Sequence, residues 1–159
     1  MTSLSLQRRH PVRVLLVFLA AVVVVAVFGS LFSISAGDEY SGLRQPSWAP
    51  PSWLFGPVWT VLYGLIALSG WLAWRGNARR RELTLYGANL VLNAFWTPLF
   101  FGLGWFWPAF AEIVLLWLTV VALVVVFWRH SRVAALLLVP YLAWVSFAGA
   151  LNFSIATLN

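Results

Sequence analysis

Two asparagines and two aromatic residues share one face of a predicted apolar helix over residues 83–101. Asn89 and Asn93 are four residues apart, and Trp96 and Phe100 continue the same stripe, because residues three and four apart are neighbours on a helix surface. Aromatic rings can stack on a planar apolar ligand, and amide groups can fix its orientation through hydrogen bonds. The stripe therefore predicts one wall of a site for a planar apolar molecule.

Two other predicted helices carry stripes of the same kind. Trp59 precedes Tyr63 by four residues, and Trp144 precedes Ala148 and Asn152 at the same spacing. The alternative interpretation is that these side chains only pack and form hydrogen bonds between helices, as is common in membrane bundles. The residues alone leave both interpretations open for the tryptophans of the three stripes.

Other chemistry has weaker support in the sequence. Glu112 lies inside a predicted span, where a carboxylate is a candidate for function, but it is one turn from the span's start and so near water. The two histidines, His10 and His130, lie at span ends, and the chain has neither a paired-carboxylate site nor a phosphate-binding loop. We therefore expect no haem ligation, no metal site, and neither a conventional hydrolase nor an ion-driven pump.

The composition predicts where these stripes lie. Of the 159 residues, 62% are apolar and 9% are charged, whereas soluble domains are about 45–50% apolar. So few polar side chains could not cover the surface of a water-soluble globule. Since the chain has no cysteine, a disulfide scaffold and a cysteine-ligated metal centre are excluded. We predict a single integral membrane domain over residues 1–159.

Five continuous apolar stretches are long enough to cross a bilayer, which takes about 20 residues in a helix. They predict an all-α bundle of five transmembrane helices. The first stretch is either a retained helix or a cleaved signal peptide. Its apolar run of about 20 residues exceeds the usual signal core of about 7–15 and favours a retained helix. The predicted spans are residues 12–35, 54–74, 83–101, 107–128 and 133–158.

The arginines predict the orientation of the bundle. If the N-terminus is cytoplasmic, every arginine except Arg44 lies on the cytoplasmic side, which is the positive-inside pattern. This pattern explains the net charge of +6 without a nucleic-acid partner and fits a bacterial cell membrane. The nine arginines are Arg8, Arg9, Arg13, Arg75, Arg79, Arg80, Arg81, Arg129 and Arg132.

The connector over residues 36–53 is the longest between predicted spans. Its three prolines stiffen it and oppose a helix around them. Long loops in compact proteins are often lids or binding loops, and this one lies on the same predicted outer side as Trp59 and Trp96. We predict a lid over an outward-facing aromatic pocket.

Three segments carry a resemblance to a known family. Residues 45–63, QPSWAPPSWLFGPVWTVLY, resemble the signature of the translocator protein family, also called tryptophan-rich sensory proteins or peripheral-type benzodiazepine receptors. Residues 89–102, NLVLNAFWTPLFFG, resemble its third-helix signature, and PYLAW at 140–144 with LNF at 151–153 resembles its fifth. These motifs occur in the family's order, and only the first helix lacks one.

The resemblance implies five transmembrane helices, a homodimer, and a pocket beneath the first long loop that binds porphyrins, sterols and isoquinoline carboxamide-type ligands. Phe153 stands where the sterol-associated pattern requires tyrosine, and no basic residue follows it. This departure argues against sterol binding through that pattern, which is a weak predictor in any case. By resemblance, the pocket is lined by Trp48, Pro51, Trp59, Tyr63, Asn93, Trp96, Trp144, Ala148 and Leu151.

Three functions follow as hypotheses. The first is a membrane receptor, sensor or carrier for tetrapyrroles such as protoporphyrin IX, bound as ligand or substrate and not as a tightly held cofactor. The second is a light-dependent porphyrin-degrading enzyme, in which the resemblance implicates Trp59 and Trp144 and an indole could donate an electron to the photoexcited ring. The third is a structural or regulatory membrane protein whose aromatic residues only pack.

Overall fold

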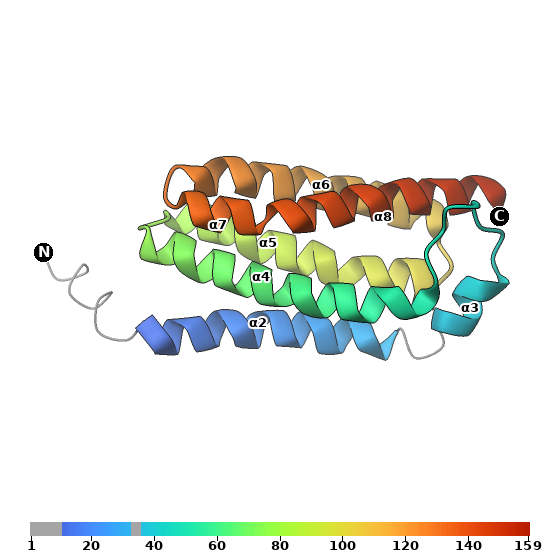
Figure 1. The fold of residues 1–159 in the computed structure, drawn as a ribbon, viewed down its shortest axis with the longest axis horizontal. Coiled ribbons are helices and arrows are strands. Elements are labelled where there is room, and N and C mark those ends of the chain that lie inside the picture. The colour runs from blue at the N-terminus through green and yellow to red at the C-terminus, as the bar shows by residue number, and fades with distance from the viewer. Residues whose placement is uncertain (1–10, 33–35) are drawn as a thin grey trace, which may run out of the picture.

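The computed structural model describes residues 11–32 and 36–159, and these residues form helices and connectors without a strand, as the predicted all-α class requires. In the described part of the chain, five long helices run side by side in a bundle (Figure 1). Shorter helical segments are α3 (Ala36–Gly42), the 3-10 turn η1 (Ser52–Leu54), the π-helix η2 (Pro98–Gly102) and α7 (Arg132–Leu137). The long helices are α2 (Pro11–Leu31), α4 (Phe55–Arg75), α5 (Arg80–Thr97), α6 (Phe106–Trp128) and α8 (Val139–Leu158).

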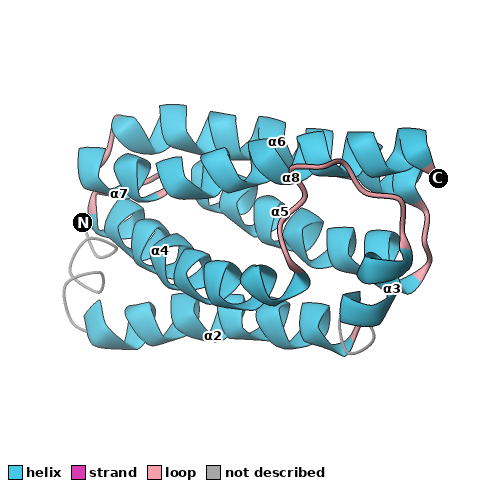
Figure 2. Cartoon of the chain, turned by 45° about the vertical axis from the view of Figure 1, so that its right-hand side comes forward, coloured by secondary structure: helices cyan, strands magenta, loops and turns pink. Residues whose placement is uncertain are grey.

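The helices pack as an open ring. Helix α2 lies against α4 and α5, α5 against α6, and α6 against α8, while α7 returns the chain to α4. The backbones of α4 and α8 approach each other in few places, and aromatic side chains meet between them, such as Phe55 with Trp144 and Trp59 with Tyr141. The connector that follows α3 passes across the α8 side of the bundle before it enters α4 (Figure 2). The packing order therefore leaves a seam between α4 and α8.

Four helical segments in the described part of the chain are long and apolar enough to cross a membrane: Pro11–Leu31, Ser52–Arg75, Phe106–Trp128 and Arg132–Leu158. They match four of the five predicted spans within a few residues, although residues 33–35 of the first lie outside the described residues. The remaining prediction, 83–101, corresponds to α5 and η2. Helix α5 is less apolar because it begins with three charged residues and contains two asparagines.

Prolines interrupt two of the predicted spans. Proline lacks the N–H group that an α-helix needs from an interior residue. Pro98 begins the π-helix η2 at the end of α5, and Leu138 separates α7 from α8 two residues before Pro140. The predicted span 133–158 is therefore two helices in succession.

The connector over residues 36–53 has more helical structure than the predicted loop, because it contains α3 and the first residues of η1. Tyr40 of α3 is 3% exposed, with its ring 5.5 Å from Phe55 and 6.5 Å from Phe101. Its hydroxyl donates a hydrogen bond to the carbonyl of Pro50 over 3.1 Å. Burial of this ring stabilises a helical turn ahead of the proline-rich part.

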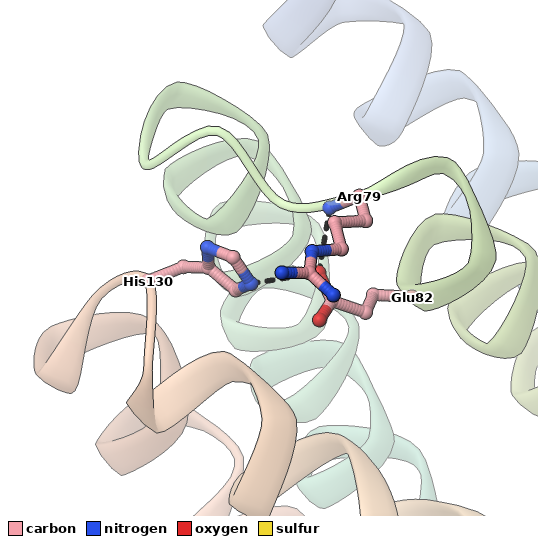
Figure 3. A network of polar contacts seen from close by, with 3 residues as sticks. All are labelled: Arg79, Glu82 and His130. Atoms are coloured by element: carbon pink, nitrogen blue, oxygen red, sulfur yellow. Dashed lines mark hydrogen bonds and ion pairs between the residues drawn. The ribbon is translucent and has the colours of Figure 1, made fainter.

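An acidic residue joins two turns at the arginine-rich end of the bundle (Figure 3). The Glu82 carboxylate lies 2.7 Å from Nε2 of His130 and accepts a hydrogen bond from the backbone N–H of Arg79 over 2.6 Å. Although burial opposes ionisation, these hydrogen bonds and the nearby positive charges lower the pKa of Glu82. The contact fixes the α4–α5 turn against the α6–α7 turn.

Candidate functional site

A cavity of about 600 Å³ lies between α2 and α4, within the 300–1,000 Å³ range of small-molecule pockets. Helix α3 and η1 line one end of the cavity, and α5 and η2 also contribute to its lining. Most of its lining is apolar or aromatic, with a few hydroxyl groups. The lining residues are Ala26, Val27, Gly29, Ser30, Tyr40, Ser52, Trp53, Phe55, Gly56, Trp59, Thr60, Tyr63, Thr97 and Phe101.

Helix α4 supplies the aromatic wall of this cavity. Trp59 and Tyr63 are one turn apart, and their rings stack with centroids 5.4 Å apart and planes inclined by 29°. Phe55 extends the wall by another turn, and Gly56 leaves open space, since a Cβ there would meet no atom within 4 Å. The predicted stripe of Trp59 and Tyr63 therefore does face a cavity.

A chain of hydrogen bonds connects this wall to the bundle interior. The Tyr63 hydroxyl donates to Oδ1 of Asn93 over 2.9 Å, and Nδ2 of Asn93 donates to the Tyr141 hydroxyl over 3.0 Å. Tyr141 donates to Oδ1 of Asn89 over 3.3 Å, and Nδ2 of Asn89 donates to Thr119 over 2.8 Å. The two asparagines thus link α4, α5, α6 and α8, as the packing interpretation of their stripe expects.

Three other predicted site residues are buried in the interior and do not line the cavity. Trp96 stacks on Phe100 at 5.1 Å and donates to Oδ1 of Asn152 over 3.1 Å. Ala148 and Leu151 are buried in the inner face of α8. These residues pack in the interior, and Trp96 reaches the cavity only through Phe101, whose ring lies 5.9 Å away and lines it.

Trp144 lines a different space, a groove of about 620 Å³ between α4 and α8. Its ring lies 5.7 Å from Phe55 and 5.4 Å from Phe147, and its indole N–H is buried without a hydrogen-bond partner among the described residues. Trp59 lines the α2–α4 cavity, so the two predicted catalytic tryptophans line different spaces. They are linked through Phe55, which lines the cavity and contacts Trp144. The groove is lined by Pro57, Val58, Val61, Leu62, Leu65, Pro140, Ala143, Trp144 and Phe147.

The predicted lid residues lie near the site but outside the cavity lining. Trp48 is half-exposed and packs its ring 5.7 Å from Phe147 of α8. Pro51 is exposed and precedes η1 with an extended backbone. The connector instead contributes Tyr40, Ser52 and Trp53 to the cavity.

Hydrogen bonds hold this connector in place. The backbone N–H of Arg44 donates to Oδ1 of Asn159 over 3.0 Å, and Nδ2 of Asn159 donates to the Arg44 carbonyl over 3.0 Å. The Gln45 side chain also donates to the carbonyl of Tyr40. The middle of the connector is therefore fastened to the end of α8.

Glu112 is more buried than its position near the start of a span suggested. The residue is 9% exposed, and neither carboxylate oxygen has a hydrogen-bond partner in the part of the chain that the structure describes. It does not line the cavity or the groove. Across residues 11–32 and 36–159, no three His, Asp or Glu side chains gather as a metal site would require.

Sequence reasoning missed the contribution of α2, which supplies one wall of the cavity through Ala26, Val27, Gly29 and Ser30. No family motif covers this helix. The available signal was its cluster of small residues, because small side chains on an apolar helix leave room beside it.

Comparison with known proteins finds relatives that cover most of this chain. A "Protein CrtK" from Rhodobacter capsulatus is 40% identical over 148 residues, covering 90% of this chain and 91% of that protein. A "Tryptophan-rich protein TspO" from Chlorobaculum tepidum is 44% identical over 140 residues, covering 85% and 89%. The human "Translocator protein" is 39% identical over 124 residues, covering 73% and 72%. Because the profile of the TspO/MBR family also matches residues 17–158, the chain belongs to this family of membrane proteins.

Proposed function

We propose that this chain is a membrane receptor, sensor or carrier that binds tetrapyrroles such as protoporphyrin IX in the α2–α4 cavity. The observation that carries the proposal is the stack of Trp59 on Tyr63 in the wall of a cavity of about 600 Å³. A flat conjugated ring gains dispersion and quadrupole energy against such a wall. A relative from Cereibacter sphaeroides, 37% identical, is named "Tryptophan-rich sensory protein", which favours a sensory role.

The lining suits the face of a porphyrin better than its metal. Neither an imidazole nor a thiolate is present among the cavity residues. The hydroxyls of the two lining tyrosines, Tyr40 and Tyr63, already donate hydrogen bonds to protein oxygens, whereas haem proteins hold iron through side chains of these kinds. Hydroxyl groups of Ser30, Ser52 and Thr60 lie among the lining residues and can meet the polar edge of the ligand. The pocket therefore binds the macrocycle through its faces and edges, and it can admit other flat apolar molecules, including isoquinoline carboxamide-type ligands and sterols.

The proposed arrangement in the membrane has five crossings. Helix α5 continues into η2 and lies within the bundle beside α6 and α2, which supports its role as the fifth span. The described arginines other than Arg44 lie at the end opposite α3, which supports a cytoplasmic N-terminus in a bacterial cell membrane. The assembly that we propose is a homodimer.

Tryptophan fluorescence tests this function. Protoporphyrin IX is titrated into the purified protein in detergent, in the dark and under light. We expect saturable quenching, because the cavity places Trp59 against the bound ring. Quenching that stays linear with porphyrin concentration would reject a tetrapyrrole site.

Light-dependent breakdown of the bound porphyrin is the second candidate function. It is favoured by the contacts that bring both tryptophans to the cavity: Trp59 lines it, and Trp144 touches Phe55, which also lines it. An indole at either position could donate an electron to the photoexcited porphyrin, with dissolved dioxygen as the oxidant. Loss of the porphyrin spectrum under light would support this function, and equal loss in the Trp59→Phe, Trp144→Phe double variant would reject it.

A further inference from the structure

Arginines from three parts of the chain gather at the end of the bundle opposite α3 (Figure 1). They lie at the start of α2, around the α4–α5 turn and around the α6–α7 turn. The contact between Glu82 and His130 joins the two turns (Figure 3), and the indole N–H of Trp71 in α4 donates to the Pro11 carbonyl of α2 over 2.9 Å. We call these exposed side chains the arginine patch: Arg13, Arg75, Arg79, Arg80, Arg81, Arg129 and Arg132.

The positive charge of the arginine patch is not balanced by nearby acidic side chains. Glu82 is the acidic residue at this end of the described structure, and its carboxylate contacts His130 and the backbone N–H of Arg79. Within the described residues, no arginine of the patch forms an ion pair with a carboxylate. The other acidic residues of the described chain lie in α3 and in the first half of α6, toward the opposite end. The patch is therefore complementary in charge to an anionic partner.

Two tryptophans place the arginine patch at the depth of lipid head groups. The guanidinium carbon of Arg75 lies 4.8 Å from the centre of the Trp71 ring, and that of Arg132 lies 5.8 Å from the centre of the Trp128 ring. Indole rings near the ends of spanning helices prefer the membrane interface, and both tryptophans belong to segments able to cross a membrane. The guanidinium groups are therefore level with the phosphates of the surrounding lipid.

We propose that the arginine patch binds the head groups of anionic phospholipids. A guanidinium group can donate two parallel hydrogen bonds to a phosphate, and a cluster of arginines beside a spanning helix attracts anionic lipids. A zwitterionic head group carries a cation of its own, which the patch repels, so phosphatidylglycerol binds in preference to phosphatidylcholine. The α4 residues that line the α2–α4 cavity belong to the first half of that helix, so the patch at its other end is a separate site.

Arg80 and Arg81 are the members of the patch best suited to substitution. Other members stack over an indole ring or begin the turn that Glu82 holds, whereas the guanidinium groups of Arg80 and Arg81 make no such contact among the described residues. Arg44 provides the matched control, because it is an exposed arginine at the opposite end of the bundle. Its hydrogen bonds to Asn159 use its backbone N–H and carbonyl, so a change of its side chain leaves them in place.

Native mass spectrometry measures the bound lipid directly. The full chain is stripped of lipid in detergent, and equal amounts of dioleoyl phosphatidylglycerol and dioleoyl phosphatidylcholine are added. We expect the wild type and Arg44→Gln to retain phosphatidylglycerol in excess. Arg80→Gln and Arg81→Gln should each reduce the retained phosphatidylglycerol several-fold, and the double variant at least about fivefold, because each arginine contributes to the attraction. Lysine at both positions keeps the charge and should keep the preference.

Equal retention of the two lipids by the wild type would overturn the proposal. So would a preference that survives in the double glutamine variant, or one that Arg44→Gln reduces by the same factor. Added inorganic phosphate distinguishes a lipid from a soluble anion: phosphatidylglycerol should stay bound, and its complete displacement would make the patch a site for free phosphate instead. Because no porphyrin is present, the result does not depend on the proposed function of the α2–α4 cavity.

Discussion

Tyr63 takes part in both the wall of the cavity and the hydrogen bonds of the bundle interior. The ring of Tyr63 stacks with Trp59 at the cavity, while its hydroxyl begins the hydrogen-bond chain through Asn93. Spacing in the sequence predicted such pairs, because residues four apart meet on a helix. It could not predict which residues face a cavity, since that depends on how each helix is rotated against its neighbours.

The hydrogen-bond chain gives a ranked prediction for stability. Tyr63→Phe removes the donor to Asn93 and should lower the free energy of unfolding by about 1 kcal/mol. Asn93→Ala should cost more, because it breaks contacts with both Tyr63 and Tyr141. Thermal unfolding in detergent measures both changes. If Tyr63→Phe proves at least as damaging as Asn93→Ala, the hydrogen-bond chain does not carry the stability assigned to it.

The contact of Glu82 with His130 makes stability depend on pH. Since folding lowers the pKa of Glu82, protons bind more tightly to the unfolded state. The stabilisation is therefore present above the ordinary value of 4.5 and is lost as pH falls through the folded pKa. Glu82→Gln should cost about 1 kcal/mol at about pH 6, and this cost should shrink as the pH falls below 4.5. A difference in unfolding temperature that persists at low pH would contradict this assignment.

Among the helices, α4 has the central position. One set of its residues, including Trp59 and Tyr63, lines the α2–α4 cavity, and another set, including Val61 and Leu62, lines the groove between α4 and α8. The family motif covers the start of α4, so its importance could be predicted. The role of α2 was harder to predict, because its signal was a small cluster of small residues in an otherwise uniformly apolar sequence.

The packing of α2 on α4 depends on a glycine. A Cβ at Gly70 would lie 2.8 Å from the rings of Phe18 and Tyr86, whereas a Cβ at Gly87 would meet no atom within 4 Å. Gly70→Ala should destabilise the fold by about 1–3 kcal/mol through overpacking. Gly87→Ala should be neutral or slightly stabilising. Chemical denaturation tests the pair, and equal effects would show that α2 does not pack tightly at Gly70.

The connector between α3 and α4 should control ligand exchange. Asn159→Ala removes both hydrogen bonds that tie this connector to α8 at Arg44. Association and dissociation of protoporphyrin should both become faster, with little change in the dissociation constant, because the cavity wall is untouched. Stopped-flow fluorescence measures both rates. Rates equal to those of the wild type would show that the connector does not gate the cavity.

At the level of the whole molecule, hydrophobic run length predicted the helical boundaries well. The predicted span 107–128 matches α6 at Phe106–Trp128, because an uninterrupted apolar segment has one plausible structure in a bilayer. The common pocket remains a prediction. The resemblance places Trp59 and Trp144 on one pocket, whereas in the structure they line two different spaces. Such a division depends on packing between distant helices, which local spacing does not encode.

The affinity for protoporphyrin of two phenylalanine variants tests the tetrapyrrole site most directly. Gly56→Phe places a ring inside the α2–α4 cavity, and Gly64→Phe places the same ring elsewhere on α4; a Cβ at either position has no atom within 4 Å. We predict that Gly56→Phe weakens protoporphyrin binding at least about tenfold, a loss equal to about 1.4 kcal/mol, because its ring takes up space that the macrocycle needs. Gly64→Phe should keep the wild-type dissociation constant. Unchanged affinity in Gly56→Phe, with the fold intact, would show that tetrapyrroles do not bind in this cavity.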